Sequence, residues 1–367
     1  MGTPAYRVLV CDLRSDALLD VLPVTEVSVE DYIGKAGSLH ATVPVPNREI
    51  ADRVRPILRG GRTALWVERD RDIWWGGILW SKTPKIDERG YASYEIQAGT
   101  FDTYLDHRRL FESLRAENID QLDIARNLVD YAQSLPGGDI GIAYDTHLSG
   151  IKRTRSYSKH DQTPIRELLD KLAAVEDGFE WRIRCDRTAD TGRRRKLLEL
   201  GYPRIARGEA DIVLNHPGPV LTYEHPEDAT TVANVWQARG ASNNNNQAAE
   251  SKPLLSELLV DEQALADGWP RLDGASDHSS VDDATTLGQY ARGEAAHARR
   301  PQVIPAVTCR LDQGVTPDLI GRTVRLRARD LLYPDGYDTR HRVVGITVTP
   351  PTRDKGETAT LTLEAAA

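Results

Sequence analysis

The amino-acid sequence predicts a β-rich α+β protein with more than one domain. Its 367 residues suit about two to four domains of ordinary size. Short apolar or alternating runs, separated by turn residues, dominate both ends of the chain. Three stretches in between repeat their apolar residues every three to four positions. This order favours two outer β portions with mixed segments between them.

Composition limits the classes of function. The chain has 47 Lys+Arg against 55 Asp+Glu and a net charge of -8, so no general attraction to nucleic acid or anionic membrane is predicted. Cys11, Cys185 and Cys309 are far apart and form no CxxC pair, which predicts neither a disulfide framework nor a zinc site. The N-terminus has no signal-peptide pattern, and no stretch approaches the roughly 20 apolar residues of a membrane span. We expect a protein that is made, and at first kept, in a cytoplasm.

The first hundred residues carry strand signals. Residues 66–68 and 73–80, joined by a turn at 69–72, predict a hairpin whose second strand is bent or bulged at Gly76-Gly77. Residues 91–98 alternate strictly between apolar and polar positions, as in a half-buried strand. Several such strands at close spacing indicate a barrel or a sandwich.

Two helices and a hairpin follow. One helix begins at Asn118 as its cap and ends at residues 136–138, and a second begins at Thr163-Pro164. The second helix buries four apolar residues: Ile165, Leu168, Leu169 and Leu172. Residues 179–185 then alternate, and a turn at 190–192 leads to a partner strand near 196–200. Residues 106–202 are therefore predicted to be a small α+β domain.

The last third mixes loop, helix and strand. Strand signals over 211–239 end at residues 240–247, a polar segment that we expect to be a mobile loop. A helix over 279–299 is predicted, with Ser279 or Ser280 as its cap. Near the C-terminus two strands present one apolar face each, formed by Val324, Leu326 and Ala328 and by Val344, Ile346 and Val348.

No pattern of catalytic chemistry stands out. The sequence has no dinucleotide-binding, P-loop, nucleophile-elbow, HExxH or EF-hand motif. Its nine histidines are scattered, without metal-ligand spacing. The adjacent acids Asp282 and Asp283 fall at the start of a predicted helix, where they stabilise its dipole. We predict no catalytic, cofactor-binding or metal site, no cofactor and no enzymatic activity.

Two clusters leave alternatives open. The basic residues of 152–159 and 193–196 could contact nucleic acid or an acidic neighbour, although solvated loops are favoured in an acidic chain. The aromatic group at 66–80 could form a sugar-binding platform, but neighbouring tryptophans more often fill a core or an interface. Its members are Trp66, Trp74, Trp75 and Trp80.

A resemblance to a known family runs over nearly the whole chain. Four segments carry it: 74–80 (WWGGILW), 94–105 (YEIQAGTFDTYL), 200–204 (LGYPR) and 342–350 (RVVGITVTP). With them the sequence resembles minor tail proteins of actinobacterial tailed phages, a group similar to the baseplate hub family at the tip of flexible and contractile tails. These motifs are structural, so no functional residues transfer with them.

The resemblance implies a threefold ring in which two tube-like β-barrels of each chain imitate the sixfold tail tube. The barrels would be residues 1–105 and the split region 203–240 plus 301–367. Residues 106–202 would form the α+β domain, and 241–300 a loop and small helical insertion. The implied partners in the virion are two further copies, the distal tail, tail tube and tape-measure proteins, and tip or spike proteins. DNA would pass through the lumen.

The sequence also departs from many hub proteins. Those continue into a peptidoglycan hydrolase, a receptor-binding module or a spike, whereas this sequence ends at Ala367, just after its last predicted strand. Cell-wall cleavage is therefore expected from another subunit. The competing hypotheses are a carbohydrate-binding protein for host adsorption and, with less support, a tail-associated hydrolase.

Overall fold

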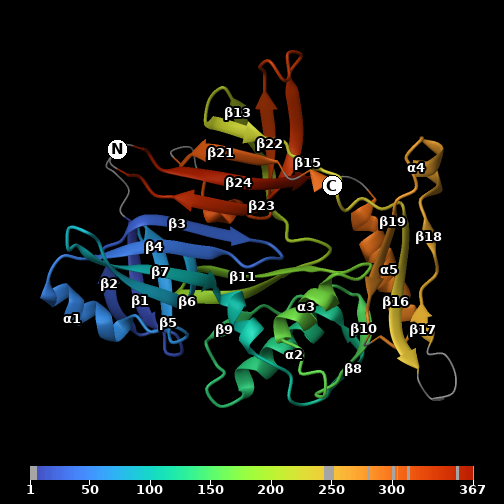
Figure 1. Ribbon diagram of the computed structural model, residues 1–367, viewed down its shortest axis with the longest axis horizontal. Helices are drawn as coiled ribbons and strands as arrows, with labels where there is room; N and C mark the ends of the chain where they lie inside the picture. The colour runs from blue at the N-terminus through green and yellow to red at the C-terminus, as the bar shows by residue number, and fades with distance from the viewer. Residues whose placement is uncertain are drawn as a thin grey trace. The chain divides into compact units, whose positions relative to one another are not determined.

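A computed structural model describes residues 6–243, 252–279, 281–299, 302–303, 305–311, 315–352 and 355–366 (Figure 1). The chain divides into two compact units. Unit 1 comprises Met1–Leu169, Glu180–Glu224 and Pro305–Ala367, and unit 2 comprises Asp170–Phe179 and His225–Ile304. Among the described residues, no helix is both long and apolar enough to cross a membrane.

The first β portion of unit 1 is an antiparallel sheet with the strand order β2-β1-β5-β6-β7-β4-β3. A helix that the sequence did not predict, α1, is capped by Asn47 and connects β4 to β5. The elements are β1 (Tyr6–Asp12), β2 (Leu18–Leu22), β3 (Thr25–Tyr32), β4 (Ser38–Val45), α1 (Arg48–Ile57), β5 (Thr63–Arg69), β6 (Asp72–Ile86) and β7 (Ala92–Thr100).

The predicted hairpin of residues 66–80 is confirmed. Asp70 and Arg71 have φ of 52° and 80°, as in the two-residue turns that match strand twist. The predicted bulge at Gly76-Gly77 is wrong, since the register shifts at Val67/Glu68 and at Leu79/Ser81, on either side of the pair. The glycines are required by crowding instead: a Cβ on Gly77 would lie 2.1 Å from the carbonyl oxygen of Gly99.

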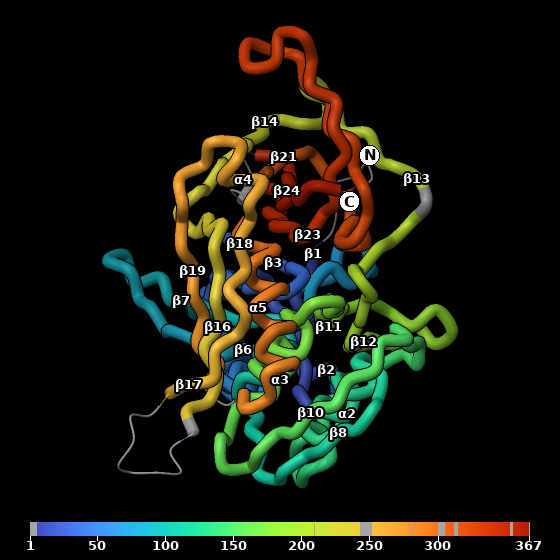
Figure 2. The backbone as a smooth tube through the Cα atoms, turned by 90° about the vertical axis from the view of Figure 1, so that its right-hand side faces the viewer, coloured from blue at the N-terminus to red at the C-terminus, as the bar shows by residue number. Residues whose placement is uncertain are grey.

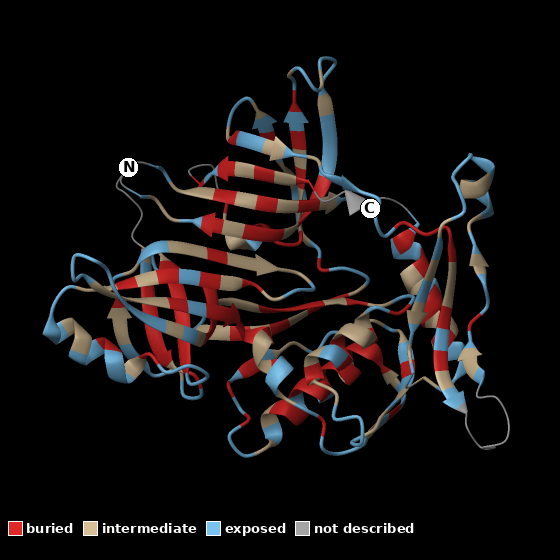
Figure 3. Cartoon of the chain, in the orientation of Figure 1, coloured by how far each residue is buried: buried red, intermediate tan, exposed pale blue. Residues whose placement is uncertain are grey.

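The second β portion belongs to the same 13-stranded sheet as the first. Its strand β23 pairs with β3 of the first portion, with Gly345 opposite Tyr32, and β13 runs parallel to β22. The elements are β13 (Arg207–His216), β14 (Val220–Glu224), β21 (Ala306–Arg310), the 3₁₀ turn η3 (Pro317–Leu319), β22 (Arg322–Ala328), β23 (Tyr337–Thr349) and β24 (Thr358–Ala365). One buried apolar cluster extends through both portions (Figure 3).

Most of the predicted strand faces near the C-terminus are confirmed. Val324 and Leu326 are fully buried, and Ala328 is nearly so. Val344 is the exception: the register of β23 shifts between Val343 and Gly345, so Val343 is buried in place of Val344. A bulge reverses the side-chain alternation, which a strict period of two cannot anticipate.

An α+β segment lies between the two portions along the chain. Its strands β11 and β12 form an antiparallel hairpin, and β9 runs parallel to β12. The helix α2 is capped by Asp120, not by Asn118 as predicted, because β8 extends through Asn118. The elements are η1 (Phe101–His107), β8 (Leu114–Asp120), α2 (Gln121–Ser134), β9 (Ile142–Tyr144), β10 (Lys152–Tyr157), α3 (Ile165–Ala173), β11 (Glu180–Arg187) and β12 (Arg194–Gly201).

Unit 2 is built on a small sheet that the sequence did not predict. The strands β17, β18 and β19 pair with β16, and Leu287 and Ala291 of α5 pack against Ala238 of β16. The insertion thus holds strands as well as helices. The elements are β15 (Glu227–Asp228), β16 (Val235–Asn243), β17 (Lys252–Leu255), β18 (Leu259–Val260), α4 (Glu262–Ala266), β19 (Asp273–Asp277), α5 (Ala284–Ala298) and β20 (Gln302–Val303).

Two predictions for this region need correction. The cap of α5 is Asp283, so Ser279 is not the cap, and Ser280 lies outside the described residues. Residues 240–243 of the expected loop extend strand β16, while residues 244–247 lie outside the described residues.

Candidate assembly surfaces

The described residues offer no evident centre for metal or thiol chemistry. Among them, no group of three His, Cys, Asp or Glu side chains could hold a metal ion. Burial raises the pKa of Cys11 to about 11 and that of Cys309 to about 12, and it raises the pKa of Cys185 well above the ordinary value. Such thiols are protonated at neutral pH and are poor nucleophiles. Asp283 accepts a hydrogen bond of 2.7 Å from the Thr286 amide, which confirms its helix-stabilising role.

The tryptophan group lies mainly in the core. Trp66, Trp74 and Trp75 are 0%, 6% and 2% exposed. Trp80 stacks on His107 at 4.3 Å between ring centroids, and its indole N–H donates to the Thr103 hydroxyl over 2.8 Å. A sugar-binding platform needs an exposed ring face, so the core interpretation is confirmed for the three buried rings.

Most residues of the two basic clusters lie in strands β10 and β12, so the prediction of loops is wrong for them, whereas Lys159 and Arg193 lie outside these strands and are exposed. Lys196 is 3% exposed and donates to the carbonyl oxygens of Leu13 and Ile140. Arg194 pairs with Asp16 at 2.9 Å. In the other cluster, Arg153 is 7% exposed and donates to the Gln121 side chain over 2.7 Å. These particular side chains are engaged within the chain.

A group of buried ion pairs, here called the charged junction, joins the two β portions to the α+β segment. Arg342 of β23 binds Glu180 of β11 at 2.6 Å, Glu364 of β24 at 2.7 Å and the Ile205 carbonyl oxygen at 2.9 Å. The residues next to Arg342 in the sequence do not reveal this ion pair, because Glu180 is 162 positions away. Buried arginines with several oxygen partners fix the geometry of the elements that supply them.

The second centre of the charged junction is Arg182, which is 4% exposed. It binds Asp31 of β3 at 3.1 Å and Glu199 of β12 at 2.8 Å. Glu199 also pairs with Arg207 of β13. Burial raises the pKa of Asp31 to about 6, although Arg182 acts in the opposite direction. The charged junction therefore contains a carboxyl group that titrates near neutral pH.

A protruding loop joins β22 to β23, and we call residues 329–336 the hairpin tip (red, Figure 2). Leu331 and Leu332 in it are 99% and 77% exposed. The tip is nevertheless ordered by its own contacts. Asp330 accepts hydrogen bonds from the amides of Leu332 at 2.9 Å and Tyr333 at 3.2 Å, and from the Tyr223 hydroxyl at 2.5 Å. Two adjacent leucines are thus held in solvent on a defined scaffold.

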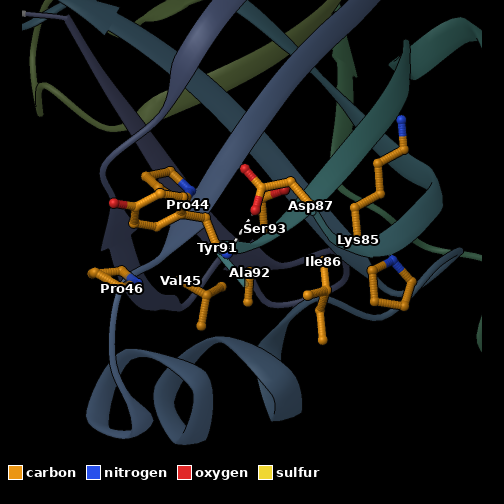
Figure 4. A pocket seen from close by; sticks show the side chains of 10 residues that line it. Pro44, Val45, Pro46, Lys85, Ile86, Asp87, Tyr91, Ala92 and Ser93 are labelled. Atoms are coloured by element: carbon orange, nitrogen blue, oxygen red, sulfur yellow. Dashed lines mark hydrogen bonds between the residues drawn. The ribbon is translucent and has the colours of Figure 1, made fainter. Parts of the chain in front are cut away.

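A hollow lies where the free ends of β4, β6 and β7 meet, and we call it the apolar pocket (Figure 4). Its volume is about 660 Å³. Ile86 and Tyr91 in its lining are 76% and 70% exposed. Asp87 shapes the turn between them by accepting hydrogen bonds from the amides of Arg89 and Tyr91 at 2.9 and 2.8 Å. The remaining lining residues are Pro44, Val45, Pro46, Pro84, Lys85, Ala92 and Ser93.

No protein-family model and no curated protein sequence matches the chain. Solved structures of tail proteins match it over nearly the full length of both chains. The tail protein from Neisseria meningitidis MC58 has a TM-score of 0.62 at 12% identity, over 98% of this chain and 96% of that one. The 43 kDa tail protein of prophage MuSo2 from Shewanella oneidensis gives 0.62 at 11% identity, over 98% of both chains.

A prophage tail protein from Listeria monocytogenes EGD-e gives a TM-score of 0.54 at 10% identity, over 98% of this chain and 95% of that one. Likenesses at these identities establish the fold. The chain has the fold of these tail proteins, and the match covers nearly the full length of each.

Sequence reasoning missed both exposed features. It said nothing of residues 330–336, and it placed residues 91–93 only in a half-buried strand. The signal available was the pair Leu331-Leu332 beside a Pro-Asp-Gly turn. Adjacent leucines in a turn cannot both face a core, so their exposure was in principle predictable.

Proposed function

We propose that this protein is the structural hub of a phage tail tip or baseplate, of the kind found in actinobacterial tailed phages. Three copies form a ring that adapts the sixfold tail tube and distal tail ring to a threefold tip. The observation that carries the proposal is the likeness of fold to tail proteins over 98% of the chain. An assembled tail needs rigid subunits with exposed contact surfaces, and this chain offers both.

The two β portions give the proposal a structural basis. Each is a mainly antiparallel set of strands, and β3 and β23 join them in one sheet. In the proposed ring, residues 1–105 and residues 203–240 plus 301–367 act as paired tube-like domains. Three chains then present six β portions to the tail tube.

The proposed partners are the distal tail protein, the tail tube protein, the tape-measure protein and tip or spike proteins. The ring holds the tape-measure protein until ejection and then lets DNA pass. The net charge of -8 suits a lumen to which DNA does not adhere. A reconstruction of the tail tip would show three copies in a ring with a neutral or negative lumen. A strongly basic lumen wall would contradict the proposed passage of DNA.

The proposed role is structural, not enzymatic. The buried Trp66, Trp74 and Trp75 speak against a wall-binding role for these rings. Purified chain is therefore expected to stay in solution when mixed with host cell walls and to clear no zone in zymography. Wall binding that is lost in a folded Trp74→Ala variant would support the carbohydrate-binding alternative.

A further inference from the structure

We propose that the hairpin tip of one copy inserts Leu331 and Leu332 into the apolar pocket of the next copy in the ring. The inference rests on the proposed trimeric hub and assigns its subunit contact. Both features lie in unit 1, the tip between β22 and β23 and the pocket at the ends of β4, β6 and β7. One chain therefore carries a protrusion and a hollow of matching chemistry.

The chemistry of the tip requires a partner. Leu331 and Leu332 are 99% and 77% exposed and lie next to each other on an ordered loop. An exposed apolar patch of this kind is unusual on a free surface. Asp330 fixes the backbone through the amides of Leu332 and Tyr333, so little conformational entropy remains to be lost on docking. The tip is prepared for binding.

The apolar pocket offers a suitable acceptor. Three prolines, Pro44, Pro46 and Pro84, line it together with Val45, Ile86 and Tyr91. Its volume of about 660 Å³ falls within the roughly 300–1,000 Å³ of pockets that hold drug-sized ligands. Two leucine side chains fit such a space. Prolines and the short Asp87 turn keep the walls stiff, so the hollow persists without its occupant.

Charges around the two surfaces complement each other. Within the described ranges, Arg329 and Asp335 on the hairpin tip have no ion-pair partner in the chain. The apolar pocket has Lys85 and Asp87 in its lining. Lys85 pairs with Glu95 at an exposed position, where such a pair contributes little and can be exchanged. Docking can therefore set Asp335 near Lys85 and Arg329 near Asp87.

The symmetry of this contact favours a second copy over an unrelated partner. The tip and the pocket are different patches of one chain, so their contact is heterologous and closes into a ring when the rotation between copies fits. A threefold ring contains three such contacts. Each buried leucine strengthens a contact by on the order of 10- to 100-fold in affinity.

Cysteine pairs test the contact directly in the full chain. One batch carries Leu332→Cys, another carries Ile86→Cys, and the two are mixed under mild oxidation. A covalent dimer that contains both chains is expected in the mixture, and the double variant in one chain should give covalent trimers. Leu148→Cys replaces Leu332→Cys in the matched control, because Leu148 is also an exposed leucine of unit 1, at 60%. The native thiols of Cys11 and Cys309 are buried, and Cys185, which is half-buried, is replaced by alanine in every chain of the experiment.

A second variant separates this inference from the proposed function. The double substitution Leu331→Asp and Leu332→Asp should raise the concentration at which trimers dissociate by at least about 100-fold, with an unchanged circular dichroism spectrum. Two outcomes would overturn the contact and leave the hub intact. In the first, the wild-type chain forms trimers but the cysteine variants form no mixed disulfide. In the second, the aspartate variant keeps its trimers. Wild-type chain that stays monomeric in sedimentation would overturn the ring itself.

Discussion

The two β portions share one sheet but differ in their interiors and at their free ends. The first buries Trp66 and Trp75, whereas the strands of the second, β13, β14 and β21 to β24, hold no tryptophan and fill their interior with aliphatic side chains such as Leu326 and Leu361. At its free end the first portion has a hollow and the second a protrusion. One backbone plan can therefore serve two complementary surfaces when its core and its loops vary independently.

The largest expected effect comes from the crowded glycines, and it should differ between the portions. In Gly77→Ala the new Cβ would meet the Gly99 carbonyl oxygen at 2.1 Å, and backbone cannot move aside cheaply. We expect a loss of about 3 kcal/mol or more in the free energy of unfolding, or no folding. In Gly345→Ala the nearest atom, also at 2.1 Å, belongs to the Tyr32 ring, which can shift.

Chemical denaturation of both variants tests this ranking. Gly356→Ala is the control, since nothing lies within 4 Å of its Cβ position. A Gly345→Ala variant that is less stable than Gly77→Ala would contradict the proposed difference between the portions.

The next largest effect should come from the charged junction, which holds the portions to the α+β segment. Arg342→Met leaves the half-buried carboxylate of Glu180 without its cation, so we expect a loss of about 2–3 kcal/mol, below the roughly 3–5 kcal/mol of a fully buried pair. The matched control is Arg325→Met, because Arg325 pairs with Asp338 on an exposed face of the same sheet. That change should cost at most about 1 kcal/mol. If Arg342→Met and Arg325→Met lower the free energy of unfolding equally, the charged junction stabilises the fold no more than an exposed ion pair does.

An effect of similar or smaller size is expected from pH. The pKa of Asp31 is about 6 in the folded chain and 3.8 in the absence of the fold. Between these values the folded state binds more protons, so this group lowers stability as pH rises and its effect levels off above about pH 6. Relative to Asp31→Asn, the wild-type chain should lose roughly 2–3 kcal/mol between about pH 4 and pH 6.5.

Urea unfolding at several pH values measures that difference. Asp338→Asn is the control, because Arg325 lowers the pKa of Asp338 and the sign of its contribution is opposite. A wild-type chain that keeps or gains stability relative to Asp31→Asn as pH rises would contradict the assignment.

The smallest effect on stability is expected at the hairpin tip. Leu331 is 99% exposed, so Leu331→Ser should change the free energy of unfolding of the separate chain by less than about 0.5 kcal/mol. Leu326→Ala, five residues before Leu331 but fully buried, should cost about 2–5 kcal/mol. A large loss of stability for Leu331→Ser would mean that this leucine stabilises the fold of its own chain and is not free to bind another.

Sequence patterns predicted local structure well and long-range contacts poorly. The hairpin at 69–72 and the apolar residues of α3 follow from turn chemistry and a period of 3.6 residues, which are local. The predicted helix caps Asn118 and Ser279 are wrong. Strand β8 extends through Asn118, so Asp120 caps α2, and α5 begins only after its cap Asp283.

The missed sheet of unit 2 has a different cause. Strand β19 has the sequence DGASD and lacks an apolar alternation, so its pairing with β16 is imposed by the neighbouring strand. The charged junction brings together residues more than a hundred positions apart, and nothing in a single sequence reveals such a pairing. For the same reason the two exposed surfaces became evident only in three dimensions.

The mass of the native particle tests the central claim most directly. The proposed hub predicts a species of three times 40.8 kDa in sedimentation equilibrium or native mass spectrometry, seen as a threefold ring by electron microscopy. A single species of 40.8 kDa at every concentration, with no ring, would contradict it.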